Sequence, residues 1–360
     1  MNRLSHLIAT VFLLLVLKSA ATPDAALRIQ KNWDLAVETW TAEAKIATTP
    51  EARALVIAKR PNATTFARKM WETISPSLKQ DWTLEPAAWF LLAARGQFTE
   101  DAKGSKTPTF SAETEIIRKS IETDHLKSPK LIPMCMALAA LGDPRSLSIL
   151  EKIESEHPNK KTQGVAALGA SIILKNLGDN ADLTRKRLTY LRKAIIESSD
   201  VQLGTTTVAK LAEDELYVIR FLDKGRIAPD LSGVDSAGRP LKLSDHAGKV
   251  VMLLFWSSTI PESDRVVQIT ADMIKKFQGK AVVILGVNHD PLEKLRAMEA
   301  EETVAWRNFS DPENKLATEF RVNTWPTVYV LDGQRKIHYV GTHGTFAELT
   351  AEALLSEAKP

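Results

Sequence analysis

The sequence is poor in cysteine, and this limits its chemistry more than any other feature. Cys135 is the single cysteine among 360 residues, so the chain cannot form an internal disulfide, a CxxC redox pair or a cysteine-based zinc cage. Cys135 lies in an apolar helical run, where a free cysteine is typically a small buried hydrophobic residue with a raised pKa. A reactive thiol is the alternative interpretation.

The chain also lacks a strong bias of charge. Its 47 Lys and Arg against 44 Asp and Glu give a formal charge of +3, without a Lys/Arg-rich run, so nothing predicts nucleic acid as a partner. No phosphate-cradling glycine motif, nucleophile elbow or HExxH sequence is present, and no cofactor is implied. With 44% hydrophobic residues, the composition is typical of an ordinary globular protein with two or three domains.

Long apolar runs are missing as well. The apolar stretch at residues 7–17 is shorter than the ~20 residues that span a bilayer. It follows Arg3 and leads to small residues ending at Ala21, which is the layout of a secretory signal. We expect residues 1–21 to be a cleaved signal peptide and the protein to be periplasmic or secreted, with no membrane span after cleavage. An uncleaved anchor is the alternative, and no cysteine follows the run to carry a lipid.

Helical spacing of apolar residues dominates residues 24–225 and predicts an all-α domain. A short motif ends apolar helices at Gly96, Gly142 and Gly178, with spacings of 46 and 36 residues. It reads Leu-Gly-Asp in the second and third copies. Glycine is suited to the left-handed position that follows a helix. Stacked helical hairpins of the HEAT or TPR kind would explain the recurrence, and an irregular bundle is the alternative. Both interpretations predict a binding surface or spacer.

The pattern changes at Arg226. Apolar runs at residues 249–256 and 281–287 flank a helical stretch at 262–278, which predicts a βαβ unit with parallel strands. A hairpin turning at Gly238 precedes this unit. After it we expect a helix at residues 311–320, strands at 327–331 and 337–340, and a final helix at 346–357.

Several pieces of this segment carry a family resemblance. They are Ala228-Pro229-Asp230, the hairpin at 235–245, residues 248–256 ending in Phe255-Trp256, and residues 322–327 followed by Asp332-Gly333. Together they resemble the thioredoxin-like domain of the TlpA and AhpC/TSA (redoxin) group, over residues 226–360. The resemblance implies a thioredoxin-like α/β domain after the N-terminal all-α helical-hairpin domain, and thiol-disulfide oxidoreductase or antioxidant activity.

The chain departs from this family at the active site. Family members place Trp-Cys-Gly-Pro-Cys where this sequence has Thr259-Ile260-Pro261-Glu262-Ser263, and alignment on the peroxiredoxin pattern also puts Ile260 at the nucleophile. Isoleucine has no ionisable group, and losing a nucleophile can cost on the order of a million-fold in rate. The segment instead matches a capping box that starts a helix. The sequence therefore predicts an active site that has lost its catalytic residues.

Pro326 is the second feature of the predicted site. The resemblance implies a cis Trp325-Pro326 bond beside the former active site, which leaves the preceding backbone free to pair with an extended polypeptide. The predicted binding groove consists of Trp256, Thr259, Ile260, Trp325 and Pro326, with Trp256, Ile260 and Trp325 as its apolar floor. The alternative is that Pro326 only shapes the entry to its strand.

Other candidate sites are weaker. His338 and His343 have no carboxylate spaced to complete a ligand set, so we expect no metal there and a solvated or structural role. His289-Asp290 follows a predicted strand at the carboxyl edge of the sheet, where ligand sites of α/β domains tend to lie. In the resemblance, however, this place is usually the start of a loop.

Two hypotheses about function follow. In the first, the protein is an exported, redox-inactive thioredoxin-like module that binds an extended polypeptide or a partner protein, without cofactor, metal or nucleic acid. In the second, it is an oxidoreductase or antioxidant protein that uses Cys135 or an external thiol. The absence of any thiol from residues 226–360 favours the first, although enzymatic activity stays an open question.

Overall fold

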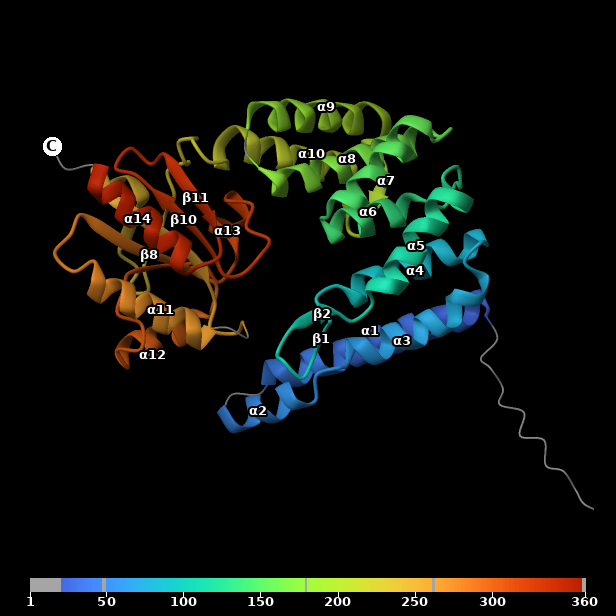
Figure 1. The fold of residues 1–360 in the computed structure, drawn as a ribbon. Coiled ribbons are helices and arrows are strands. Elements are labelled where there is room, and N and C mark those ends of the chain that lie inside the picture. The colour runs from blue at the N-terminus through green and yellow to red at the C-terminus, as the bar shows by residue number, and fades with distance from the viewer. Residues whose placement is uncertain (1–20, 47–49, 179, 261–262, 358–360) are drawn as a thin grey trace, which may run out of the picture. The chain divides into compact units, whose positions relative to one another are not determined.

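The computed structural model describes residues 21–46, 50–178, 180–260 and 263–357. The chain divides into two compact units (Figure 1), one containing residues up to Leu177 with Arg192–Val208, the other Gly178–Leu191 with Ala209 onward. The predicted signal peptide lies outside the described residues except for Ala21. Within these ranges, no helix is both long and apolar enough to cross a membrane.

The first unit is helical, as predicted, except for two short hairpins. The hairpins are β1 (Phe98–Glu100) with β2 (Lys106–Pro108) and β3 (Gln202–Leu203) with β4 (Thr206–Thr207). Helix α9 (Ala181–Ser198) begins in the second unit and ends in the first. The other helices and short helical turns are α1 (Pro23–Ile46), α2 (Pro50–Ala58), α3 (Ala63–Ile74), η1 (Ser75–Ser77), η2 (Asp81–Thr83), α4 (Leu84–Ala94), α5 (Ser111–Ser120), η3 (Ile121–His125), α6 (Ile132–Leu141), α7 (Pro144–Glu156) and α8 (Lys160–Leu177).

The junction between α6 and α7 shows how the recurring Leu-Gly-Asp motif ends one helix and starts the next. Gly142 ends α6 in the left-handed conformation, with φ of 71°, which side chains with a Cβ adopt only at a cost. Asp143 then caps α7 by accepting a hydrogen bond from the backbone N–H of Ser146 at 3.0 Å. Helix α4 packs against α6, and α6 against α8. The repeat interpretation stays a prediction.

The second unit contains a five-stranded mixed sheet in the order β11-β10-β7-β8-β9. Strands β7, β8 and β9 are parallel, whereas β10 runs antiparallel to both β7 and β11. The predicted βαβ unit is confirmed as β7 (Val250–Trp256), α11 (Ser263–Lys276) and β8 (Val282–Asn288). The remaining elements are α10 (Val208–Tyr217), η4 (Val218–Leu222), β5 (Ser232–Val234), β6 (Pro240–Lys242), η5 (Leu243–His246), α12 (Leu292–Ala300), β9 (Asn308–Ser310), α13 (Lys315–Glu319), β10 (Thr327–Leu331), β11 (Ile337–Gly341) and α14 (Thr345–Glu357).

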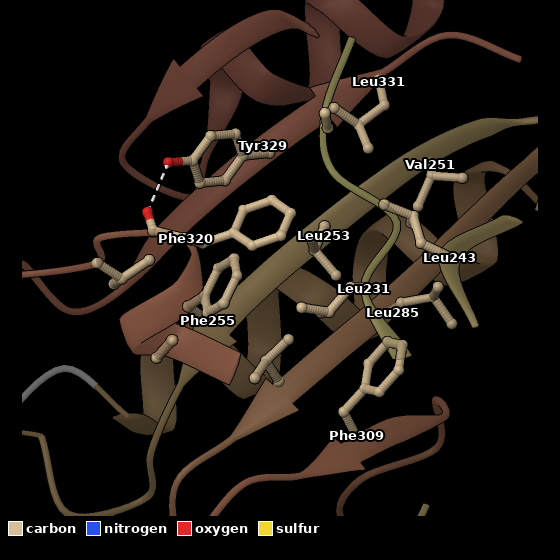
Figure 2. Close-up of a cluster of buried hydrophobic side chains, with 14 of the residues drawn as sticks. Leu231, Leu243, Val251, Leu253, Phe255, Leu285, Phe309, Phe320, Tyr329 and Leu331 are labelled. Carbon is tan, nitrogen blue, oxygen red and sulfur yellow. Dashed lines mark hydrogen bonds between the residues drawn. The ribbon is translucent and has the colours of Figure 1, made fainter. Parts of the chain in front are cut away.

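The central strand β7 separates two apolar clusters because its side chains alternate between the faces of the sheet. Phe255 and its alternate neighbours pack with Phe320, Tyr329 and the residues that flank the β5–β6 hairpin, Leu231 and Leu243, as Figure 2 shows. Trp256 and its alternate neighbours face the other way, toward apolar residues of α11 and α14. All residues of β7 are buried, which explains its unbroken apolar run.

Two elements of this unit were missed, and one was predicted too long. Helix α12 and strand β9 had no expected counterpart, and α13 spans Lys315–Glu319 where we expected residues 311–320. Strand β9 has only three residues, too few for a readable alternation. Asp311 is not helical, because its carboxylate accepts hydrogen bonds from the backbone N–H groups of Leu316 and Ala317 and so precedes the helix.

His343 illustrates how burial decides a protonation state in this unit. Its Nε2 lies 2.9 Å from the hydroxyl of Thr270, whose own proton goes to the Val266 carbonyl, so Nε2 carries a proton and donates. The other ring nitrogen has no hydrogen-bond partner within the described residues. Burial lowers the pKa of His343 to about 4, so the ring is neutral at neutral pH, in the predicted structural role.

This histidine should make folding sensitive to acid. Because the unfolded chain takes up a proton near pH ~6.5 and the folded chain does not, stability falls as the pH drops below that value, by ~1.4 kcal/mol per unit. Urea unfolding should show that wild type loses about 2 kcal/mol more than His343→Gln between pH ~7 and ~5. The matched change His338→Gln should keep the wild-type loss; equal slopes for wild type and His343→Gln would contradict this assignment.

Candidate functional site

Three loops meet at one edge of the sheet. Thr327 pairs with Phe255 in the antiparallel register, so the chain enters β10 where it leaves β7. Trp256 pairs with Asn288 in the parallel register, so β8 ends at the same edge. The loops at residues 257–260, 289–290 and 325–326 therefore lie together, and we call them the strand-end site.

A buried carboxylate organises the first two loops. Asp290 is only 1% exposed and accepts hydrogen bonds from the hydroxyls of Ser257 (2.8 Å) and Ser258 (3.0 Å) and from the backbone N–H of Ser258 (2.8 Å). The side-chain amide of Asn288 donates a further bond at 2.8 Å. These donors are all neutral, and together they provide hydrogen-bond partners for both carboxylate oxygens, which would otherwise be expensive to bury.

The third loop is joined to the second by an aromatic contact. The rings of His289 and Trp325 are 5.7 Å apart between centroids, at an interplanar angle of 32°, within the range of favourable ring pairs. Nδ1 of His289 donates to the carbonyl of Asp311 at 3.1 Å, which fixes the orientation of the ring. The Trp325-Pro326 bond is cis, as the resemblance implied.

The position of the expected nucleophile carries no ionisable group. Ile260 is half-buried and packs against the apolar cluster that contains Trp256. The hydroxyl of Thr259 bonds to that of Ser257 at 2.7 Å, while the N–H of Ser263, the first residue of α11, bonds to the Ile260 carbonyl at 3.1 Å. Pro261 and Glu262 lie outside the described residues, and with them the predicted capping box.

The structure corrects one member of the predicted groove floor. Trp256 is fully buried, and its indole N–H donates to Asn308 at 2.9 Å. It packs on the face of the sheet covered by α11 and α14, whereas Trp325 packs on the opposite face. Because Trp256 belongs to β7, the pleat points it away from Trp325. The half-buried part of the strand-end site thus consists of the contacting pair His289 and Trp325 and, separately, of Ile260, which packs on the same side of the sheet as Trp256.

The chain's one thiol is buried. Cys135 is fully buried in α6 of the helical unit, and burial raises its pKa to about 12. A thiol in this state supplies almost no thiolate at neutral pH. The prediction of a buried structural cysteine is therefore confirmed.

His338 and His343 each contact a different partner in the structure. His338 contacts the carboxylate of Asp332 at 3.0 Å, and His343 contacts Thr270. Across the described part of the chain, no group of three His, Cys, Asp or Glu side chains is placed to hold a metal ion. That the protein works without metal stays a prediction.

Ser257, Ser258 and Asn288 were not singled out from the sequence. They could have been found, because polar residues placed directly at the ends of two apolar parallel strands meet at one edge of a sheet. His289-Asp290 was named there, although only as a weak candidate. The structure shows that its carboxylate holds the loop that follows β7.

Removing this carboxylate should destabilise the second unit. Asp290→Ala leaves buried donors of Ser257, Ser258 and Asn288 unpaired, which we expect to cost about 2 to 4 kcal/mol of unfolding free energy. Asp272→Ala, on the exposed face of α11, is the matched control and should cost less than about 0.5 kcal/mol. Urea unfolding measures both, and equal costs would show that the buried network contributes little.

Relatives of the chain include thiol-disulfide enzymes. The thiol-disulfide oxidoreductase ResA of Geobacillus thermodenitrificans is 26% identical over 179 residues, which are 49% of this chain and 100% of that protein. The peroxiredoxin Bcp of Bacillus subtilis is 30% identical over 102 residues, 28% of this chain and 65% of that protein. A solved structure of a putative thiol:disulfide interchange protein DsbE from Chlorobium tepidum is 25% identical, with a TM-score of 0.34, covering 38% of this chain and 98% of its own.

The family model supports the resemblance drawn from the sequence. Residues 224–340 match the AhpC/TSA family, and this range contains the whole sheet except the last residue of β11. It also contains the strand-end site and the position of Ile260. The C-terminal part of this chain is thus a thioredoxin-like domain of the AhpC/TSA (redoxin) family.

Proposed function

We propose that the AhpC/TSA domain of this chain binds an extended polypeptide at the strand-end site without exchanging thiols. The observation that carries this proposal is Ile260, which stands where the resemblance places the family nucleophile and is half-buried against the apolar cluster that contains Trp256. A side chain without an ionisable group cannot attack a disulfide or a peroxide. Ser263 offers a hydroxyl in the first turn of α11 and no thiol.

The surface of the strand-end site supports binding rather than chemistry. Trp325, His289 and Ile260 are half-buried, and both carboxylate oxygens of Asp290 already accept hydrogen bonds. Half-buried aromatic and aliphatic side chains make favourable contact with apolar groups of a partner. An extended chain paired through its backbone, with an apolar side chain against Trp325, is the partner that this surface fits.

The second candidate is a thiol-disulfide oxidoreductase or antioxidant protein, which the relatives favour. It would have to use Cys135 or a thiol from another molecule. The burial of Cys135 and its raised pKa argue against the first route. We also propose that the protein is exported to the periplasm or secreted. This proposal rests on the signal-like residues 1–21.

Activity assays on an engineered thiol pair test the redox part. Wild type should show no disulfide reductase or peroxidase activity, while the double variant Ile260→Cys, Ser263→Cys should gain reductase activity because the surrounding domain is intact. Cys135→Ala is the matched thiol control. Activity in wild type that disappears in Cys135→Ala would refute the proposal, and silence in both proteins would show that the site is misassigned.

Peptide selection tests the binding part. Phage-displayed random peptides selected on the full chain should bind wild type, and Trp325→Ala should weaken the selected peptides by about tenfold or more, as loss of a central aromatic contact does. Trp82→Ala, in the helical unit, is the matched control and should bind normally. Fluorescence anisotropy gives the affinities. Equal affinity for wild type and Trp325→Ala would place binding elsewhere.

A further inference from the structure

His125 is a buried histidine of the helical unit that the strand-end site does not use. It ends η3 and is only 1% exposed. Its Nδ1 lies 2.8 Å from a carboxylate oxygen of Asp81, and its Nε2 lies 2.6 Å from the backbone carbonyl oxygen of Leu78. Both ring nitrogens therefore face oxygen atoms at hydrogen-bond distance.

The partners determine how many protons the ring carries. A backbone carbonyl and an ionised carboxylate can only accept hydrogen bonds. Both ring nitrogens of His125 must therefore donate. The carboxylate is the ionised partner, because bonds from the Ser128 hydroxyl and from His125 hold the pKa of Asp81 below its usual range despite partial desolvation. A neutral ring would leave a lone pair pointing at an oxygen atom from 2.6 or 2.8 Å away, which is repulsive.

We propose that His125 is a buried imidazolium that acts as a pH-sensitive latch in the helical unit. The latch joins residues 78–81, which lead from η1 into the start of η2, to the end of η3. On the first side it binds Leu78 and Asp81, and the Leu78 carbonyl also accepts from the hydroxyl of Ser120 at 3.0 Å. On the other side, the His125 carbonyl accepts from the N–H of Ser128 at 2.8 Å.

A second buried histidine lies next to the latch and has the opposite arrangement. Nε2 of His157 donates to the Ser128 carbonyl at 3.0 Å, whereas its Nδ1 accepts from the backbone N–H of Asn159 at 3.0 Å. The Asn159 carbonyl oxygen lies farther from Nδ1, at 3.3 Å. One donor and one acceptor define a neutral ring. His157 thus offers a matched control, because it is as buried as His125 and touches the same turn.

Other charged groups surround the latch without replacing its partners. Glu122, in the same turn as His125, is bound to Arg145 and Lys152. Asp124 precedes His125 in η3 and accepts from the hydroxyl of Thr123. The remaining charged residues of these segments are Lys79 beside Leu78, and Lys127 and Lys130 in the turn before α6, of which Lys130 acts electrostatically on Asp81.

Raising the pH should open this junction. Loss of one ring proton removes a hydrogen bond and places a lone pair against an acceptor, so the segments at residues 75–83 and 121–131 should separate more often. Low pH keeps both protons on the ring and keeps the latch closed. The direction is opposite to that of His343, whose neutral ring is stabilising.

Nitrogen NMR of the full chain labelled at histidine tests the charge directly. At neutral pH, His125 should show two protonated ring nitrogens, and His157 should show one protonated and one bare nitrogen. His125→Gln and His157→Gln assign the signals. A neutral His125 ring at this pH would overturn the proposal.

Hydrogen exchange tests the latch itself. Between about pH 6 and pH 9, after correction for the intrinsic pH effect, backbone amides at residues 75–83 and 121–131 should exchange about tenfold faster in wild type. His157→Gln should keep this increase, and His125→Gln should abolish it by exchanging fast at both pH values. An unchanged wild type, or an increase that persists in His125→Gln, would overturn the proposal.

Discussion

The second unit depends on a single strand that is buried on both faces. Strand β7 has β8 on one side and β10 on the other, and its alternate side chains enter separate apolar clusters. Such a strand has to be apolar throughout, and it has no room for a polar residue until it leaves the sheet. The first polar side chains after it, Ser257 and Ser258, stand at the carboxyl edge, where the strand-end site is formed.

The loops of the strand-end site are held together by interactions that do not involve a catalytic group. Asp290 holds the loop after β7 through neutral donors, and the contact between His289 and Trp325 joins the loop before β10. None of these interactions needs a thiol. The architecture of an AhpC/TSA domain therefore persists around Ile260, in line with the general observation that a fold outlives any one activity placed on it.

Burial controls the titratable groups of both units in different ways. Cys135 has apolar surroundings and is kept protonated, and His343 is kept neutral by desolvation. One ring nitrogen of His157 accepts an N–H, whereas both ring nitrogens of His125 face acceptors. Desolvation and hydrogen-bond partners, more than residue type, thus decide how these buried groups hold their protons.

Local patterns in the sequence were enough to predict strands β7, β8, β10 and β11, helices α11 and α14, and the absence of a thiol in residues 226–360, but not helix α12 or strand β9. The apolar run of β7 and the Asp332-Gly333 turn are local signals, and the identity of Ile260 needs no structure. Which face of the sheet receives Trp256 or Trp325, and which donors reach Asp290, was decided only by tertiary structure. These contacts depend on the register between strands distant in sequence, and no local pattern specifies that register.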